Sequence, residues 1–236
     1  EVLQDDAKLI LPVYIAIDHS WSMDKSENDA IDAANSLIGT IMDACAEHPI
    51  ADERARFCII GFNDHAEVVS PLQRGTNLAA HTFVAEKGTS YAEPFKLLKE
   101  QIISDHEHLK ADGFKTYRPA VFFITDGEPL DKPQALSAFN DLTDPSFELA
   151  PNISVFGVGH NVPEDVVTEY TSRKGKPFIT KTDVGASEAL GGFIELLIGS
   201  VIASTTTMGS ATTADGEEPD FVWDEGDDDF FLEIES

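Results

Sequence analysis

Short apolar runs alternate along this chain with longer stretches in which apolar residues recur every three or four positions. The runs are almost continuously apolar, which is typical of strands that are buried on both faces of a sheet. The strand at 66–70 follows a polar turn and is expected at a sheet edge. Strands are predicted at residues 13–17, 57–62, 66–70, 120–125 and 153–158, with a short one near Phe178.

The stretches between the runs have the spacing of amphipathic helices, which is clearest between Asn28 and Ala46. A capping-box pattern, Ser90 followed by Glu93, opens another helix. The repeated order of strand and helix predicts an α/β fold with a doubly wound, mostly parallel, Rossmann-like sheet flanked by helices. Further helices are predicted at 132–142, 163–171 and 187–203, and residues 71–88 are predicted to be mostly loop.

Composition separates the C-terminal end from the rest of the chain. The 236 residues hold 43 acidic and 16 basic residues, a net charge of −27, which disfavours nucleic acid and anionic membranes as partners. Residues 1–205 are predicted to form one folded domain. Residues 206–236 begin a hydroxyl-rich linker and continue into a tail with 11 acidic residues and no basic ones.

The acidic tail has two possible interpretations. A charge run is usually a solvated segment. The aromatic and aliphatic residues between the acids, such as Trp223 and Phe231, suggest instead a segment that docks in a groove or adds as a strand to a sheet edge. The hydroxyl-rich residues 205–213 are expected to be accessible to a kinase, although a plain flexible linker is the simpler interpretation.

Cysteine usage and the ends of the chain favour a cytoplasmic location. Cys45 and Cys58 lie in apolar patterns with no C-x-x-C pairing, which fits buried thiols in a reducing compartment. The first residues have acids where a signal peptide needs bases. The apolar stretch at 193–203 contains Glu195 and is shorter than the roughly 20 residues that span a bilayer.

Candidate chemistry is concentrated where strands are predicted to end. Asp18-x-Ser20-x-Ser22 follows the first strand, and Asp126 with Gly127 follows the most apolar strand. Ligands of doubly wound sheets bind at these carboxyl ends. Alternate residues leaving a strand point the same way, so a carboxylate and two hydroxyls converge on one point. Oxygen ligands with few charges predict a hard cation, Mg²⁺ or Mn²⁺, with Ca²⁺ as a further option.

Other patterns carry weaker signals. Asp-x-Ser-x-Ser alone is common at turns and helix starts, and Thr89 in Gly88-Thr89-Ser90 could simply cap the following helix. His106 and His108 are two residues apart on a predicted helix and therefore do not share a face. A phosphotransferase of the haloacid dehalogenase type would need a second Asp in place of Ser20.

The ordered set of these residues resembles the metal-ion-dependent adhesion site, MIDAS, of von Willebrand factor A domains, and the resemblance runs from about residue 11 to residue 203. The family pattern usually has Gly where this chain has Trp21, which places a bulky aromatic residue beside the site. The resemblance implies a metal held by two carboxylates and three hydroxyls. The implied ligands are Asp18, Ser20, Ser22, Thr89 and Asp126.

A closer resemblance is to cytosolic bacterial A domains associated with tellurite resistance, called TerY-like. It is carried by residues 11–14, by Tyr117-Arg118-Pro119 and by residues 126–129. It implies a non-enzymatic interaction module in bacterial signalling or stress response. The implied partners are a Ser/Thr kinase and a PP2C-type phosphatase, with a partner Asp or Glu completing the metal. The alternatives are an Mg²⁺-dependent hydrolase or phosphatase using Asp18, and an extracellular adhesin.

Overall fold

A mixed, mostly parallel sheet forms the centre of the molecule. The computed structural model describes residues 9–24, 30–159, 162–172, 174–207, 221–224 and 231–234. The strand order is β3-β2-β1-β5-β6-β7-β8, with the short β4 paired to the start of β1. The strands are β1 (Leu9–Asp18), β2 (Ala55–Phe62), β3 (Ala66–Gln73), β4 (Lys115–Thr116), β5 (Ala120–Thr125), β6 (Asn152–Gly157), β7 (Pro177–Thr180) and β8 (Phe231–Glu233).

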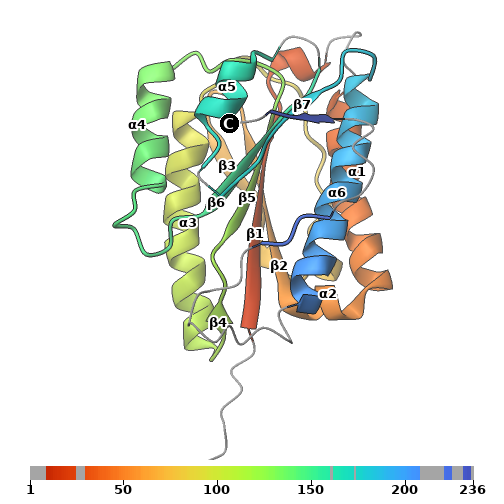
Figure 1. Cartoon of the computed structure of the whole chain (residues 1–236), viewed down its shortest axis with the longest axis vertical. Helices are drawn as coiled ribbons and strands as arrows, with labels where there is room; N and C mark the ends of the chain where they lie inside the picture. Colours follow the sequence, from red (N-terminus) through yellow and green to blue (C-terminus); the bar gives the residue numbers. More distant parts are fainter. Residues whose placement is uncertain are drawn as a thin grey trace, which may run out of the picture.

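Helices cover both faces of this sheet. Figure 1 shows α1, α2 and α6 on one side and α3, α4 and α5 on the other. The predicted doubly wound α/β fold is therefore confirmed, with β3 and β8 as antiparallel edge strands. The helices are α1 (Ala30–Glu47), α2 (Pro49–Arg54), α3 (Ala92–Ala111), α4 (Lys132–Leu142), α5 (Glu164–Glu169) and α6 (Ala186–Thr207), with short 3-10 turns η1 (Trp21–Asp24) and η2 (Gly75–Asn77).

The central strand β1 is buried on both faces, which explains its continuous apolar run. Val13, Ile15 and Ile17 belong to the apolar cluster under α1 and α6. Tyr14 and Ala16 belong to the cluster under α3 and α4. Because side chains alternate along a strand, one apolar run serves two cores. β1 is thereby fixed in register with β2 and β5, and all three end at the same edge of the sheet.

The start of α3 differs from the predicted capping box. Ser90 Oγ lies 3.4 Å from the backbone nitrogen of Glu93, a long contact. Asp131 makes the shorter ones, because its carboxylate accepts from the Tyr91 backbone nitrogen at 3.0 Å and from Ser90 Oγ at 2.6 Å. A carboxylate from the loop after β5 therefore satisfies the free N–H groups of α3. This contact ties the loop before α3 to the loop after β5.

Two described segments of the acidic tail pack on the domain. Residues 221–224 lie along α6, where Ser204 Oγ bonds the backbone nitrogen of Val222 at 2.9 Å and Ser200 Oγ accepts from Asp224 at 2.9 Å. β8 pairs antiparallel with β7, and Phe231 is buried. Strand addition at a sheet edge is thus observed within the chain. The remaining tail residues lie outside the described part.

Helix α6 corrects one expectation about the linker. It continues to Thr207, and Thr205 is fully buried with its hydroxyl donating to the Val201 carbonyl at 2.8 Å. Thr205 is therefore not an accessible kinase target, and residues 208–213 lie outside the described structure. α6 is long and apolar enough to cross a membrane, but Phe193 and Leu197 are buried against the sheet, as in a core helix.

Candidate metal site at the carboxyl ends of β1 and β5

Asp18 is the last residue of β1 and is completely buried. One carboxylate oxygen accepts a 2.8 Å hydrogen bond from the backbone nitrogen of Ser20, which turns the chain sharply out of the strand. The other accepts a 2.8 Å bond from the Thr125 hydroxyl at the end of the neighbouring strand β5. Both oxygens are held by the ends of two paired strands, so the carboxylate has a fixed position.

The two serines connect Asp18's loop to Asp126. Ser20 Oγ and Ser22 Oγ are 3.0 Å apart, and Ser22 donates a 2.5 Å hydrogen bond to Asp126 Oδ1. Met23, which is fully buried, anchors the 3-10 turn that presents the serines, and its backbone nitrogen bonds the Ser20 carbonyl. The structure therefore brings four of the five predicted ligands together as one hydrogen-bonded group of oxygens.

Thr89 lies on the loop that borders this group. Its backbone carbonyl accepts a 2.9 Å hydrogen bond from Leu130, which is in the loop that follows Asp126. Its half-buried side chain makes no hydrogen bond to a described residue. The preceding Gly88 has φ +92°, a backbone conformation that favours glycine, and it lies against the Asp64 carboxylate. Thr89 as a metal ligand stays a prediction.

Two residues of the site were not predicted from the sequence. Thr125 donates to Asp18, and Tyr91 donates to the Gly127 carbonyl at 2.7 Å while its oxygen lies 2.8 Å from Thr125 Oγ1. Both side chains are fully buried. The only sequence signal was a threonine that ends an otherwise apolar strand directly before Asp126. These two residues fix the position of Asp18 without facing solvent.

Burial and charge repulsion both disfavour the ionised form of the Asp18 carboxylate. Burial, and after it the nearby charge of Asp126, raise the pKa of Asp18 to about 7, although hydrogen bonds from Ser20 and Thr125 oppose the rise. No positive charge from a described residue contributes to this pKa. Two carboxylates that disfavour each other's ionised form, together with hydroxyl oxygens, are a suitable donor set for a divalent cation.

The described part of the chain offers no rival metal site built from His, Cys, Asp and Glu. No group of three or more such side chains gathers among the described residues. His106 bonds the Thr116 hydroxyl through Nδ1 at 2.9 Å. Cys45 and Cys58 are buried free thiols, as predicted, and burial raises the pKa of Cys45 to about 12.

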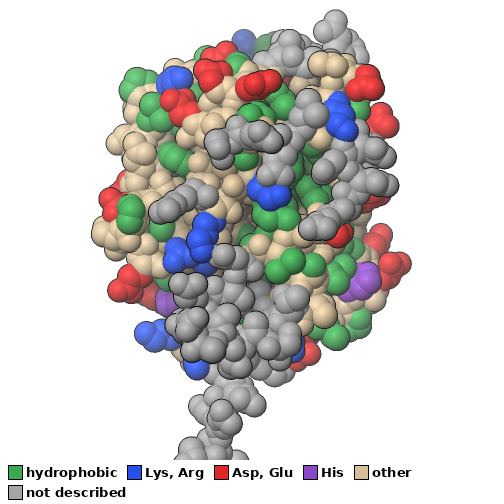
Figure 2. Space-filling view, viewed as in Figure 1, with side chains coloured by type: hydrophobic (Ala, Val, Ile, Leu, Met, Phe, Trp, Pro, Cys, Tyr) green, Lys and Arg blue, Asp and Glu red, His purple; other side chains and the backbone are tan. Residues whose placement is uncertain are grey.

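An exposed aromatic residue borders the site. Trp21 is 55% exposed, and Lys87 Nζ lies 5.3 Å from its ring centroid. Trp21 therefore presents much of its ring to solvent beside the two serines. Val84 and Leu130, on the two adjoining loops, are also exposed. On the face seen in Figure 2, acidic side chains are spread around the rim of the molecule.

Comparison with known proteins agrees with this architecture. Residues 13–128 match the family model of the von Willebrand factor type A domain. This match begins in β1 and ends two residues after Asp126, so it includes all five predicted ligands. Comparison of the sequence with curated proteins gives no match.

Solved structures with the same fold come from diverse proteins. Proximal thread matrix protein 1 from the mussel byssus, solved with a zinc-occupied MIDAS motif, is 14% identical with a TM-score of 0.57, and the match covers 84% of this chain and 48% of that one. The pilus adhesin SpaC from Lactobacillus rhamnosus GG is 10% identical with a TM-score of 0.60, over 82% and 30%. BatB from Bacteroides thetaiotaomicron is 17% identical with a TM-score of 0.53, over 84% and 99%. The chain thus spans about half or less of the first two.

Proposed function

The chain carries a von Willebrand factor type A domain, and from that premise we propose that it is a protein-binding module that depends on a divalent metal ion. The observation that supports this most strongly is the hydrogen-bonded group of Asp18, Ser20, Ser22 and Asp126 at the carboxyl ends of β1 and β5. These residues would hold the metal, with Thr89 as a further ligand. A bound metal supplies a Lewis-acidic position for a carboxylate oxygen.

Each residue has a distinct part in this proposal. Asp18 contributes a fixed negative charge whose orientation comes from the Ser20 backbone and the Thr125 hydroxyl. Ser20 and Ser22 contribute hydroxyls that are hydrogen-bonded to each other, and Ser22 also donates to Asp126. Because these ligands leave the remaining positions of a cation open, a partner protein would complete them with an Asp or Glu side chain.

The environment of Asp18 favours binding over hydrolysis. A nucleophilic carboxylate must reach a substrate, whereas both oxygens of Asp18 accept hydrogen bonds and the side chain is fully buried. Ser20, which stands where a phosphotransferase would place its acid–base Asp, is buried as well. These features support the proposal of an interaction module over that of a hydrolase using Asp18 as a nucleophile.

The proposed partners are a Ser/Thr kinase and a PP2C-type phosphatase in a cytoplasmic signalling or stress-response system of bacteria. The support for this class is the TerY-like sequence pattern of Tyr117-Arg118-Pro119 and residues 126–129. Two features of the structure are compatible with it: both thiols are buried and free, and the loops around the site present exposed Trp21 and Leu130 to a partner. The physiological metal in this proposal is Mg²⁺, with Mn²⁺ as the close substitute.

A binding experiment with purified components tests the proposal. The kinase and the phosphatase are each titrated into the full chain by calorimetry, in Mg²⁺ and again in EDTA. We expect binding in Mg²⁺, loss of binding in EDTA, and loss in Asp126→Ala. Asp24→Asn, an exposed acid of the same loop, serves as the matched control and keeps its affinity. Binding that is equal in Mg²⁺ and EDTA would contradict metal dependence.

A further inference from the structure

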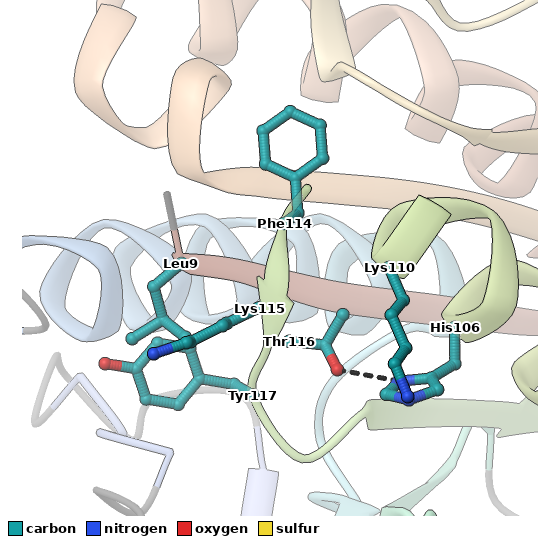
Figure 3. Close-up of a pocket in the computed structure, with 7 residues that line it drawn as sticks. All are labelled: Leu9, His106, Lys110, Phe114, Lys115, Thr116 and Tyr117. Atoms are coloured by element: carbon teal, nitrogen blue, oxygen red, sulfur yellow. Dashed lines mark hydrogen bonds between the residues drawn. The ribbon is translucent and has the colours of Figure 1, made fainter. Parts of the chain in front are cut away.

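A second concave site lies at the opposite end of β1 from Asp18. Leu9, the first residue of β1, and the two residues of β4 line a cavity of about 450 Å³. The last turns of α3 supply the rest of the wall with His106 and Lys110. Figure 3 shows these elements meeting around β4. The volume falls within the roughly 300–1,000 Å³ of small-molecule sites.

The C-terminal end of α3 shapes one wall of this cavity. Gly113 has φ +82° and its backbone nitrogen bonds the Lys110 carbonyl at 3.1 Å, while Phe114 bonds the Leu109 carbonyl at 2.9 Å. This pair of bonds is the Schellman arrangement, which satisfies the last carbonyls of α3 and turns the chain into β4. The turn positions Phe114 and Lys115, and it leaves fewer free carbonyl oxygens to repel an anion.

The polar groups of the cavity are basic. Lys110, His106 and Lys115 line it, and its described lining contains no Asp or Glu. Neither lysine forms an ion pair with a described residue. Such a lining is unusual in a chain with 43 acidic and only 16 basic residues. Figure 3 shows Lys110 with His106 on one side of β4 and Lys115 on the other.

Apolar and aromatic side chains complete the lining. Tyr117 is buried at 5% exposure and lines the cavity together with Leu9 and Phe114. The ring of Phe114 is itself held from behind by Arg56, whose guanidinium carbon is 6.0 Å from the ring centroid. On the Lys110 side, His106 is fixed by its 2.9 Å hydrogen bond with the Thr116 hydroxyl. Positive charge on both sides of β4, together with aromatic surface in the same lining, defines the ligand chemistry.

We propose that this cavity binds a small organic dianion with a planar apolar body between its two anionic groups. One anionic group would face Lys110 and His106, and the other would face Lys115. The apolar body would contact Phe114 and Tyr117. Because the cavity lies at the other end of β1 from Asp18, this site is independent of the metal and of the proposed protein-binding function.

The test uses 2,6-naphthalenedicarboxylate as the probe and the full chain in EDTA, so that a carboxylate cannot bind through a metal at Asp18. Two-dimensional NMR follows the backbone amides of residues 113–117 during the titration. We expect saturable shifts there and an affinity about fivefold weaker in Lys115→Glu and in Lys110→Glu, because reversing one exposed charge is worth about 1 kcal/mol. The uncharged 2,6-bis(hydroxymethyl)naphthalene should bind more weakly than the dianion.

A second hollow provides the matched control. It has a similar volume of about 480 Å³, but its lining combines Lys96 with Asp141 and has no aromatic residue. Lys96→Glu should leave the affinity for the dianion unchanged. The proposal is overturned if the probe does not shift residues 113–117, if the diol binds as tightly as the dianion, or if Lys96→Glu weakens binding as much as Lys115→Glu. Circular dichroism verifies that each variant is folded.

Discussion

Asp18 shows how one residue can be costly to the fold and useful to the function. A buried carboxylate without a positive partner disfavours the folded state unless its charge is removed. Its two hydrogen bonds, from Ser20 and Thr125, recover only part of this cost. Cation binding can offset the remaining destabilisation of the folded state, since a ligand that binds only the folded state stabilises it.

This cost gives a pH prediction for the protein in EDTA. The pKa of Asp18 is about 7 in the folded state and 3.8 as a free side chain, so the folded state binds the additional proton between these values. The stability contributed by Asp18 is therefore complete below about pH 4 and is lost as pH rises through 7, at ~1.4 kcal/mol per pH unit at most. Urea unfolding at pH 5 and pH 8 measures it.

Asp18→Asn isolates this effect from other titrating groups. Relative to the variant, the parent chain should lose stability between pH 5 and pH 8. A difference between the two proteins that does not change with pH would show that Asp18 titrates normally. Saturating Mg²⁺ should restore the parent chain at pH 8 and leave the variant unchanged.

Thr125 offers a second prediction at the level of single residues. Thr125→Val keeps the shape of the buried side chain and removes the hydroxyl that donates to Asp18. We expect affinity for Mn²⁺ to fall about tenfold, the size of effect seen when the partner of a metal ligand is removed. Thr125→Ser retains the hydroxyl and should bind nearly as well as the parent chain. Equal affinities in Val and Ser variants would exclude this positioning role.

Among the elements, β8 extends the sheet with residues from the acidic tail. Phe231 is buried and its ring centroid is 5.5 Å from that of Phe156. Phe231→Ala should lower the free energy of unfolding by about 3 kcal/mol, as for other buried aromatic side chains. Val222→Ala, at an exposed position of the same tail, should change it by less than about 0.5 kcal/mol. Similar values for both would mean that β8 contributes little to stability.

The long, strongly patterned elements could be predicted from the sequence. β5 and α4 have the predicted bounds, and α1 ends at Glu47, one residue beyond the predicted end. The elements that the sequence did not predict are short: α2 has six residues and β4 has two. Such segments have too few residues for a period to show, and β4 exists only because it meets the start of β1.

The residues of the candidate site also fall into two groups, those that could be predicted from the sequence and those that could not. Asp18, Ser20, Ser22 and Asp126 follow strands that the apolar runs reveal, so their convergence could be predicted. The support from Thr125 and Tyr91 could not, because a buried hydroxyl has no pattern along the chain and its partner comes from another element. Asp131 as the cap of α3 is a similar case, since it is 40 residues from Tyr91.

At the scale of the whole molecule, the parallel sheet separates two kinds of surface. The carboxyl ends of β1 and β5 present acidic and hydroxyl oxygens, whereas the start of β1 lies beside the basic, aromatic cavity. A chain of net charge −27 also attracts cations nonspecifically. A specific site must therefore be distinguished from general cation binding by its stoichiometry and by single substitutions.

The most direct test is a calorimetric titration of the full chain with Mn²⁺ at pH 8 and 0.15 M NaCl. The account predicts one saturable site in the parent chain, the same site in Asp24→Asn, and no such site in Asp126→Asn while that variant remains folded. If Asp126→Asn binds Mn²⁺ as tightly as the parent chain, or if Asp24→Asn loses as much affinity as Asp126→Asn, the metal is not held at the carboxyl ends of β1 and β5.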